Sequence, residues 1–216
     1  MASNPGTTEE RPRRRTQEER SEEMRGRLLN AAIEVLKRNG YSGFRIADVA
    51  AEANVSRGAQ IHHYPTKDDL VTASLEYVYD LVLDETAVKA AEIRPGQDVI
   101  AAVVAEASDY FFSDSFSVSL DILRSAAKNP NIADKAWQIS DRFRIAAEQP
   151  WVELLVASGL PQEDARLILW LLWSVLRGLS VRRETSTERD REQRVIDLVT
   201  TLARDHADRI RSSATA

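Results

Sequence analysis

Apolar residues recur at helical spacing over most of this chain, and no segment shows the strict alternation typical of a strand. In the first long segment, residues 16–39, a buried face is expected from Leu28, Leu29, Ala32, Ile33 and Leu36. Gly40 follows, and the access of glycine to positive φ suits it to end this helix. The pattern predicts an all-α fold of about nine helices.

The same spacing, interrupted by proline and glycine, predicts the helices that follow the first 65 residues. Thr66 and Asp69 form a capping pair that opens a helix expected to continue to about residue 93, before Pro95 and Gly96. A further helix is expected to end near residue 112. Others are expected over residues 117–128, 132–158, 162–182 and 188–211, with Pro150 kinking the second of these.

Residues 46–64 have the pattern of two short helices joined by a tight turn. The first carries one apolar stripe, formed by Ile46, Val49, Ala50 and Ala53. Asn54 lies at the turn, and asparagine tolerates a left-handed backbone better than most residues do. Ser56 is placed to cap the second helix, which Pro65 ends. A short polar helix after such a turn has the shape that fits a DNA major groove.

These residues resemble the DNA-binding module of the TetR (tetracycline-repressor-like) family of bacterial one-component regulators. The resemblance covers about residues 25–70, through Gly40-Tyr41, Val49-Ala50, Val55-Ser56, Gly58, Tyr64 and Thr66-Lys67-Asp68. Three positions depart from the family pattern: Arg45 replaces a usual Thr, Asn54 a usual Gly, and Ile61 a usual Tyr. Isoleucine cannot donate a hydrogen bond to a phosphate oxygen, so one phosphate contact is left without its donor.

The resemblance implies a homodimeric DNA-binding transcriptional regulator, a repressor released by a ligand and acting on a palindromic operator. It divides the chain into a tail (1–15), a helix-turn-helix domain (16–66) and a helical domain for effector binding and dimerisation (67–216). Arg57 and Gln60 can reach guanine and adenine edges, and Lys67 adds a charge where a helix N-terminus favours phosphate. The candidate DNA contacts are Arg45, Arg57, Gly58, Ala59, Gln60, His62, His63 and Lys67. The alternative for each is an ordinary surface side chain.

The segment 162–182 is apolar around most of its circumference, so this helix should be covered on two sides. Together with a stripe on the last helix, it predicts a four-helix bundle between two copies of the chain. The candidate interface residues are Leu167, Trp170, Leu171, Ser174, Gly178, Val195, Val199, Leu202 and His206. The alternative is a core formed within one chain.

Aromatic residues gather in the middle of the chain, where the family has a cavity among helices four to eight for a small effector. The candidate lining residues are Tyr77, Tyr110, Phe111, Phe116, Arg124, Trp137, Phe143, Trp151 and Trp173. Arg142 and Asp121 are further candidates for anchoring a polar group. The alternative for each aromatic residue is plain core. An apolar effector with one polar end fits this composition.

The charge of the chain is unevenly distributed, which bears on its partner. Of 216 residues, the first 70 hold 12 Lys/Arg and 11 Asp/Glu, whereas the remainder hold 17 and 23. The acidic excess therefore lies outside the predicted DNA-binding module, and the local field governs attraction to phosphate. The basic run of Arg11, Arg13, Arg14 and Arg15 could lie in a minor groove or form a solvated tail.

The residue types present argue against several other classes of function. The chain has no cysteine, and His62 and His63 are neighbours that point to different sides of a helix, so neither a disulfide nor a metal site is expected. No catalytic motif, cofactor motif, membrane span or secretory signal appears, and a cytoplasmic location is expected. The alternatives are an all-α small-molecule-binding protein or enzyme without a DNA partner, and a DNA binder without an effector.

Overall fold

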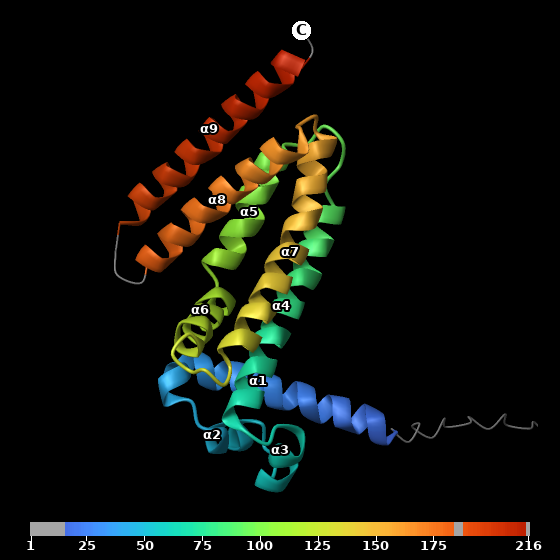
Figure 1. Ribbon diagram of the computed structural model, residues 1–216, viewed down its shortest axis with the longest axis vertical. Coiled ribbons are helices and arrows are strands. Elements are labelled where there is room, and N and C mark those ends of the chain that lie inside the picture. Colours follow the sequence, from blue (N-terminus) through green and yellow to red (C-terminus); the bar gives the residue numbers. More distant parts are fainter. Residues whose placement is uncertain (1–15, 184–187, 215–216) are drawn as a thin grey trace, which may run out of the picture.

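The computed structural model describes residues 16–183 and 188–214 (Figure 1). These ranges contain nine helices: α1 (Gln17–Gly43), α2 (Ile46–Glu52), α3 (Arg57–His63), α4 (Lys67–Ala91), α5 (Val99–Phe111), α6 (Asp114–Ala126), α7 (Ala133–Ala157), α8 (Gln162–Arg183) and α9 (Arg189–Ala214). No strand is present among the residues described, and the predicted all-α class is confirmed. The predicted tail, residues 1–15, lies outside them.

Capping side chains start the helices of the N-terminal module as predicted. The Ser56 hydroxyl accepts a hydrogen bond from the Ala59 amide at 3.2 Å and opens α3. Thr66 and Asp69 form a reciprocal capping box at the start of α4. Asn54 has a φ of 51°, the left-handed backbone expected at the turn between α2 and α3. The helix-turn-helix geometry therefore follows from short-range hydrogen bonds.

Several helix boundaries differ from the prediction, including the end of α9, which continues to Ala214 rather than to residue 211. Gly40, at a φ of 61°, interrupts α1 where its end was expected, but a short helical turn continues to Gly43. α4 ends at Ala91 rather than near residue 93. α6 begins at Asp114 rather than near residue 117, because the Ser113 hydroxyl accepts from an amide in the first turn and caps the helix. Pro150 lies within α7, which continues through it.

Two hydrophobic cores hold the helices together. One joins α1, α2 and α3 to the first turns of α4, to α6 and to the start of α7, and includes Leu28, Val49, Tyr64, Leu70, Ile122 and Ile139. The other, here called the upper core, lies among α5, α7, α8 and α9, and includes Val103, Trp151, Leu169, Leu172, Leu176 and Ala203. Figure 1 shows α1, α2 and α3 at one end of the molecule and α8 and α9 toward the other, with α4 and α7 running between.

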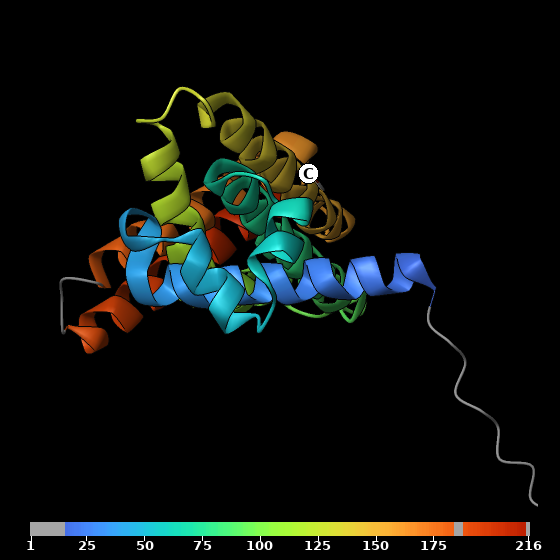
Figure 2. The ribbon, with the colours of Figure 1, turned by 90° about the horizontal axis from the view of Figure 1, so that it is seen from below.

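α6 lies at the junction of these two parts, next to α1 (Figure 1). Seen from below, α1 crosses the end of the molecule beside α2 and α3 (Figure 2). α6 contributes Phe116 to the upper core and Val118, Ile122 and Ala126 to the core of the N-terminal module. Among the helices of the described ranges, none combines the length and apolar character that crossing a membrane requires.

Candidate functional site

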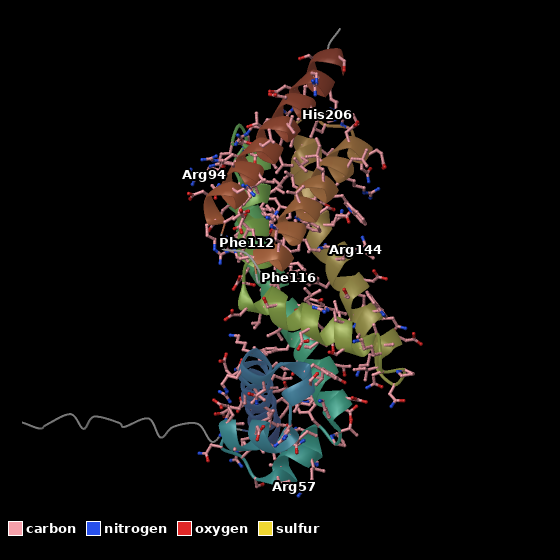
Figure 3. All side chains as sticks on the ribbon, turned by 90° about the vertical axis from the view of Figure 1, so that its left-hand side faces the viewer. Arg57, Arg94, Phe112, Phe116, Arg144 and His206 are labelled. Carbon is pink, nitrogen blue, oxygen red and sulfur yellow. The ribbon has the colours of Figure 1, made fainter. Side chains whose placement is uncertain are left out.

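α3 is the exposed tip of the N-terminal module. Figure 3 shows Arg57 at the end of the molecule farthest from α9. Arg57, Gly58 and His62 are exposed, whereas Ala59 and His63 are half-buried. Ile61 is exposed beside them, although it is a large apolar residue. Except for Gln60, the residues of α3 that were predicted to contact DNA therefore lie where a duplex could reach them.

Gln60 is the exception, and its predicted contact with adenine is wrong for this structure. The side chain is 0 % exposed, its Nε2 donates to the Tyr64 carbonyl at 2.5 Å, and its Oε1 is buried without a hydrogen-bond partner. Gln60 lies one helical turn before Tyr64, which packs into the module core. The register of α3 against that core therefore directs Gln60 inward.

The two histidines of α3 lie with their ring centroids 5.3 Å apart, edge to face. Burial and the neighbouring His62 lower the pKa of His63, so His63 is neutral at neutral pH. In the DNA-free protein its imidazole can hydrogen-bond to a base edge or donate to a phosphate. Within residues 16–183 and 188–214, no group of three or more side chains is arranged to hold a metal ion.

Lys67, the predicted phosphate contact, is half-buried and bound to the end of α1. Its ammonium donates to the Tyr41 carbonyl at 2.8 Å and lies 4.3 Å from the centroid of the Tyr41 ring. The same ammonium lies 5.7 Å from the centroid of the Phe44 ring. An ammonium has three donors, and the Tyr41 carbonyl accepts from one of them. Lys67 can therefore still donate to a phosphate, and that contact stays a prediction.

Two arginines lie at opposite ends of α2, the helix before the turn that positions α3. Arg45, a predicted DNA contact, is exposed at the start of α2 and makes no side-chain cap there. Arg27 of α1 donates to the carbonyls of Ala53 and Asn54 at 2.5 and 3.1 Å. Arg27 thereby satisfies carbonyls at the end of α2 and fixes the turn before α3, a role that no sequence pattern indicated.

A cavity of about 470 Å³ lies among α4, α5, α6, α7 and α8. Most of the predicted lining residues do line it: Tyr110, Phe111, Phe116, Arg124, Trp137, Phe143 and Trp173. Tyr77 and Trp151 do not, and their prediction is wrong. Trp151 belongs to the upper core, and Tyr77 is two positions from Tyr79, which places it on the far side of α4 from the cavity.

Aromatic rings form most of the apolar wall. Tyr79 and Phe143 stack with centroids 4.0 Å apart and an interplanar angle of 8°. Tyr110 contacts Phe143 at 5.5 Å and Phe116 at 5.6 Å, and Phe116 meets Phe111 at 5.1 Å. Figure 3 shows Phe116 and Arg144 in the middle part of the molecule, between Arg57 and His206. Such a wall suits a flat or apolar ligand.

A few polar groups interrupt this wall, and of those described next only Tyr110 was predicted from the sequence. The Thr86 hydroxyl donates to Glu106 Oε1 at 2.6 Å, and burial raises the pKa of the Glu106 carboxyl. Burial also raises the pKa of Tyr79 and Tyr110, which keeps both phenols neutral. The Arg177 guanidinium carbon is 5.3 Å from the centroid of the Phe111 ring. Glu106 lies within the largely apolar segment 99–111, and its place there was a signal that could have pointed to this site.

The two other residues proposed as polar anchors are not in the cavity. Arg142 pairs with Glu76 at 2.9 Å on the surface between α4 and α7. The Asp121 carboxylate instead accepts a hydrogen bond from the Tyr41 amide at 2.6 Å, on the side of α6 that meets α1. Both predictions are wrong because these helices turn the two side chains away from the ligand side.

The outer faces of α8 and α9 carry an exposed apolar surface. On α8, all five predicted interface residues are exposed: Leu167, Trp170, Leu171, Ser174 and Gly178. On α9, Leu202 is 54 % exposed and His206 is exposed, but Val195 is half-buried and Val199 is only 6 % exposed. The prediction for Val199 is therefore wrong, because α9 packs onto its own subunit through Ile196, Val199, Ala203 and Ala207. Leu198, 59 % exposed, was missed.

Comparison with known proteins agrees with this architecture. Residues 28–73 match the model of the family described as bacterial regulatory proteins, tetR family. The chain is 40 % identical over 194 residues to the HTH-type transcriptional regulator CymR of Pseudomonas putida, covering 90 % of this chain and 96 % of CymR. It is 25 % identical over 170 residues to the HTH-type nicotine-responsive transcriptional repressor HdnoR of Paenarthrobacter nicotinovorans, covering 74 % and 83 %.

A solved structure supports the same fold. The crystal structure of a transcriptional regulator from Rhodococcus sp. Rha1 superposes with a TM-score of 0.64 at 21 % identity, covering 83 % of this chain and 95 % of that one. The proteins named in these comparisons are regulators of transcription rather than enzymes. With a 40 % identical relative spanning nearly its whole length, the chain belongs to the TetR family of bacterial helix-turn-helix transcriptional regulators.

Proposed function

We propose that this regulator is a homodimeric repressor that leaves a palindromic operator when a small, largely apolar effector fills the cavity. The observation that carries the proposal is the span of α4. This helix of 25 residues starts beside the recognition helix and lines the cavity with Tyr79, Val82 and Thr86. A helix of that length, about 37 Å at 1.5 Å per residue, joins the two sites directly. A ligand that shifts α4 changes the position of α3.

On the DNA side, we assign base reading to the exposed part of α3. Arg57 would donate to a guanine edge, with His62 and His63 nearer the helix end, while Gly58 and Ala59 allow close approach of the backbone. Arg45 and Lys67 would contact phosphates on either side. Gln60 is omitted from this set because it is buried.

The gene's own upstream region is the first duplex on which to test this assignment. The wild-type protein should retard this duplex in a gel-shift titration at low salt. A duplex that shows no retardation would contradict the proposal. Arg57→Ala should relax the sequence preference of binding. Arg45→Ala should weaken binding to all duplexes equally and lower the salt dependence of binding. Equal binding of both variants and the wild type would refute the proposed orientation of α3.

A second copy of the chain is the proposed occupant of the α8/α9 face. Its exposed residues Leu167, Trp170, Leu171, Leu198 and Leu202 come from two adjacent helices, as a four-helix bundle across a two-fold axis requires. Two-fold symmetry would also place two copies of α3 at successive major grooves. One short helix reads too few base pairs to select an operator, so dimerisation supplies the second half-site.

The effector is proposed to be a small molecule with an apolar, ring-sized body and one polar end. The stacked rings of Tyr79 and Phe143 suit the body, and the buried Glu106 or the phenol of Tyr110 can receive the polar end. HdnoR is a nicotine-responsive relative, which supports a response to a molecule of this size. A binder without an effector is disfavoured by the size of the cavity.

Thermal denaturation in the presence of candidate compounds tests the cavity as an effector site. A compound present at 100 times its Kd should add about 2.7 kcal/mol to the free energy of unfolding. The same compound should weaken binding to the operator. Compounds that stabilise the protein without changing its affinity for DNA would refute the repressor-release mechanism.

A further inference from the structure

α6 has one face on the cavity and the other on the N-terminal module. Phe116, Leu120 and Leu123 line the cavity from this helix. Ile122 and Ala126 are fully buried in the core that contains Leu28 and Val35 of α1. A displacement of α6 by a ligand would therefore act on α1 as well as on α4, because packed helices move as bodies.

A directional hydrogen bond fixes the contact between α6 and α1. The Tyr41 backbone amide donates to Asp121 Oδ2 at 2.6 Å, between residues 80 positions apart in the chain. Gly40, with a φ of 61°, turns the backbone so that this amide faces α6. A Cβ at Gly40 would lie 3.2 Å from the same Asp121 oxygen, so glycine also makes room for the carboxylate. Hydrogen bonds to an ionised acceptor are stronger than neutral ones.

Other contacts hold Tyr41 against the start of α4. Lys67, in the first turn of α4, donates to the Tyr41 carbonyl at 2.8 Å. Asn129, just after α6, lies with its Nδ2 3.4 Å from the Tyr41 hydroxyl and 3.4 Å from both carboxylate oxygens of Asp68. The backbone at Tyr41 is therefore the place where α1, α4 and α6 are joined by polar contacts.

We propose that Asp121 is a positioning residue that couples the cavity to the recognition helix through the Tyr41 amide. An occupant of the cavity pushes on the Phe116 and Leu123 side of α6, and Asp121 on the opposite side transfers the displacement to the end of α1. Since α1 braces the turn before α3 through Arg27, the recognition helix moves with it. This route adds to the one through α4 and rests on the effector function proposed above.

The test compares the wild-type protein with Asp121→Ala and, as a matched control, Asp114→Ala. Asp114 is also an α6 carboxylate near α1, but it is 80 % exposed and 3.8 Å from Lys37 Nζ. The cavity probe is 1-anilinonaphthalene-8-sulfonate, and the DNA is a duplex selected with the wild-type protein from random sequence. Three quantities are measured: the Kd of the dye for DNA-free protein, and the Kd of the duplex with and without saturating dye.

The dye should weaken duplex binding by the wild type and by Asp114→Ala at least tenfold. Asp121→Ala should bind the dye within twofold of the wild type, yet its duplex Kd should change less than twofold when dye is added. A tenfold change in Asp121→Ala would overturn the inference and leave the proposed function intact. No change in the wild type would refute the effector function and this inference together.

A second variant separates coupling from folding. Asp121→Asn keeps an oxygen acceptor of the same size but loses the charge, so its response to the dye should lie between those of the wild type and Asp121→Ala. Hydrogen exchange of the Tyr41 amide should be at least tenfold faster in Asp121→Ala and closer to the wild-type rate in Asp121→Asn. A wild-type exchange rate of the Tyr41 amide in Asp121→Ala, or a wild-type dye response in that variant, would contradict the proposed role.

Discussion

Replacing Gln60 by Met distinguishes a buried structural glutamine from a residue that reads DNA. Gln60 is 0 % exposed, and its Oε1 has no hydrogen-bond partner in the described structure. A buried acceptor without a partner costs about 1–3 kcal/mol. Methionine has a similar volume and removes that acceptor, but it also removes the hydrogen bond from Nε2 to the Tyr64 carbonyl, worth about 1 kcal/mol. The free energy of unfolding should therefore stay unchanged or rise by up to about 2 kcal/mol.

The effect of Gln60→Met on DNA binding is the decisive part. A glutamine paired with adenine contributes about 1–3 kcal/mol of discrimination, so its loss would weaken operator binding roughly 5- to 150-fold. Because Gln60 faces the core, we expect the Kd measured by fluorescence anisotropy to change less than twofold. Arg57→Ala on the exposed side of the same helix serves as the comparison and should weaken binding at least fivefold. A tenfold loss in Gln60→Met with unchanged stability would refute the inward placement of this side chain.

Two further predictions concern the dimer face and the cavity. Leu202→Glu places a charge on the α8/α9 face and should give a monomer at micromolar concentration, measured by size-exclusion chromatography with light scattering. The control is Val88→Glu, at a residue of α4 that is 61 % exposed, and it should leave the measured mass unchanged. Burial raises the pKa of Glu106, so the native state holds that proton more tightly than the unfolded chain does. Between the ordinary glutamate pKa and the raised native value, stability should therefore fall as pH rises, and Glu106→Gln should flatten this part of a denaturation series. Wild-type pH dependence in Glu106→Gln would contradict that assignment.

Local signals predicted the helix-turn-helix module closely. Ser56, Thr66 and Asp69 act on amides within their own helix turn, and Asn54 sets its own backbone angle, so their roles are visible in a few neighbouring residues. Periodicity predicted the helices for the same reason. The start of α6 was not found in this way: it was expected near residue 117, whereas the Ser113 hydroxyl caps the helix.

Features set by packing could not be read in the same way. Polar character placed Gln60 on the surface, but its register with Tyr64 places it in the core. On α9, the apolar stripe is broad, and the sequence did not distinguish the inward Val199 from the outward Leu198. Asp121 meets Tyr41 across 80 positions, a contact that only the tertiary arrangement reveals. These errors arise because a helical period predicts a buried face but not which side chains at its edge are buried.

In the proposed assembly, two copies of the chain, joined through α8 and α9, place two recognition helices on one operator. Native mass spectrometry of the protein with a selected palindromic duplex and with a duplex carrying one half-site tests it most directly. We expect two protomers on the palindrome at nanomolar concentration and at least a hundredfold weaker binding to the single half-site. One protomer on each duplex with equal affinity would contradict it.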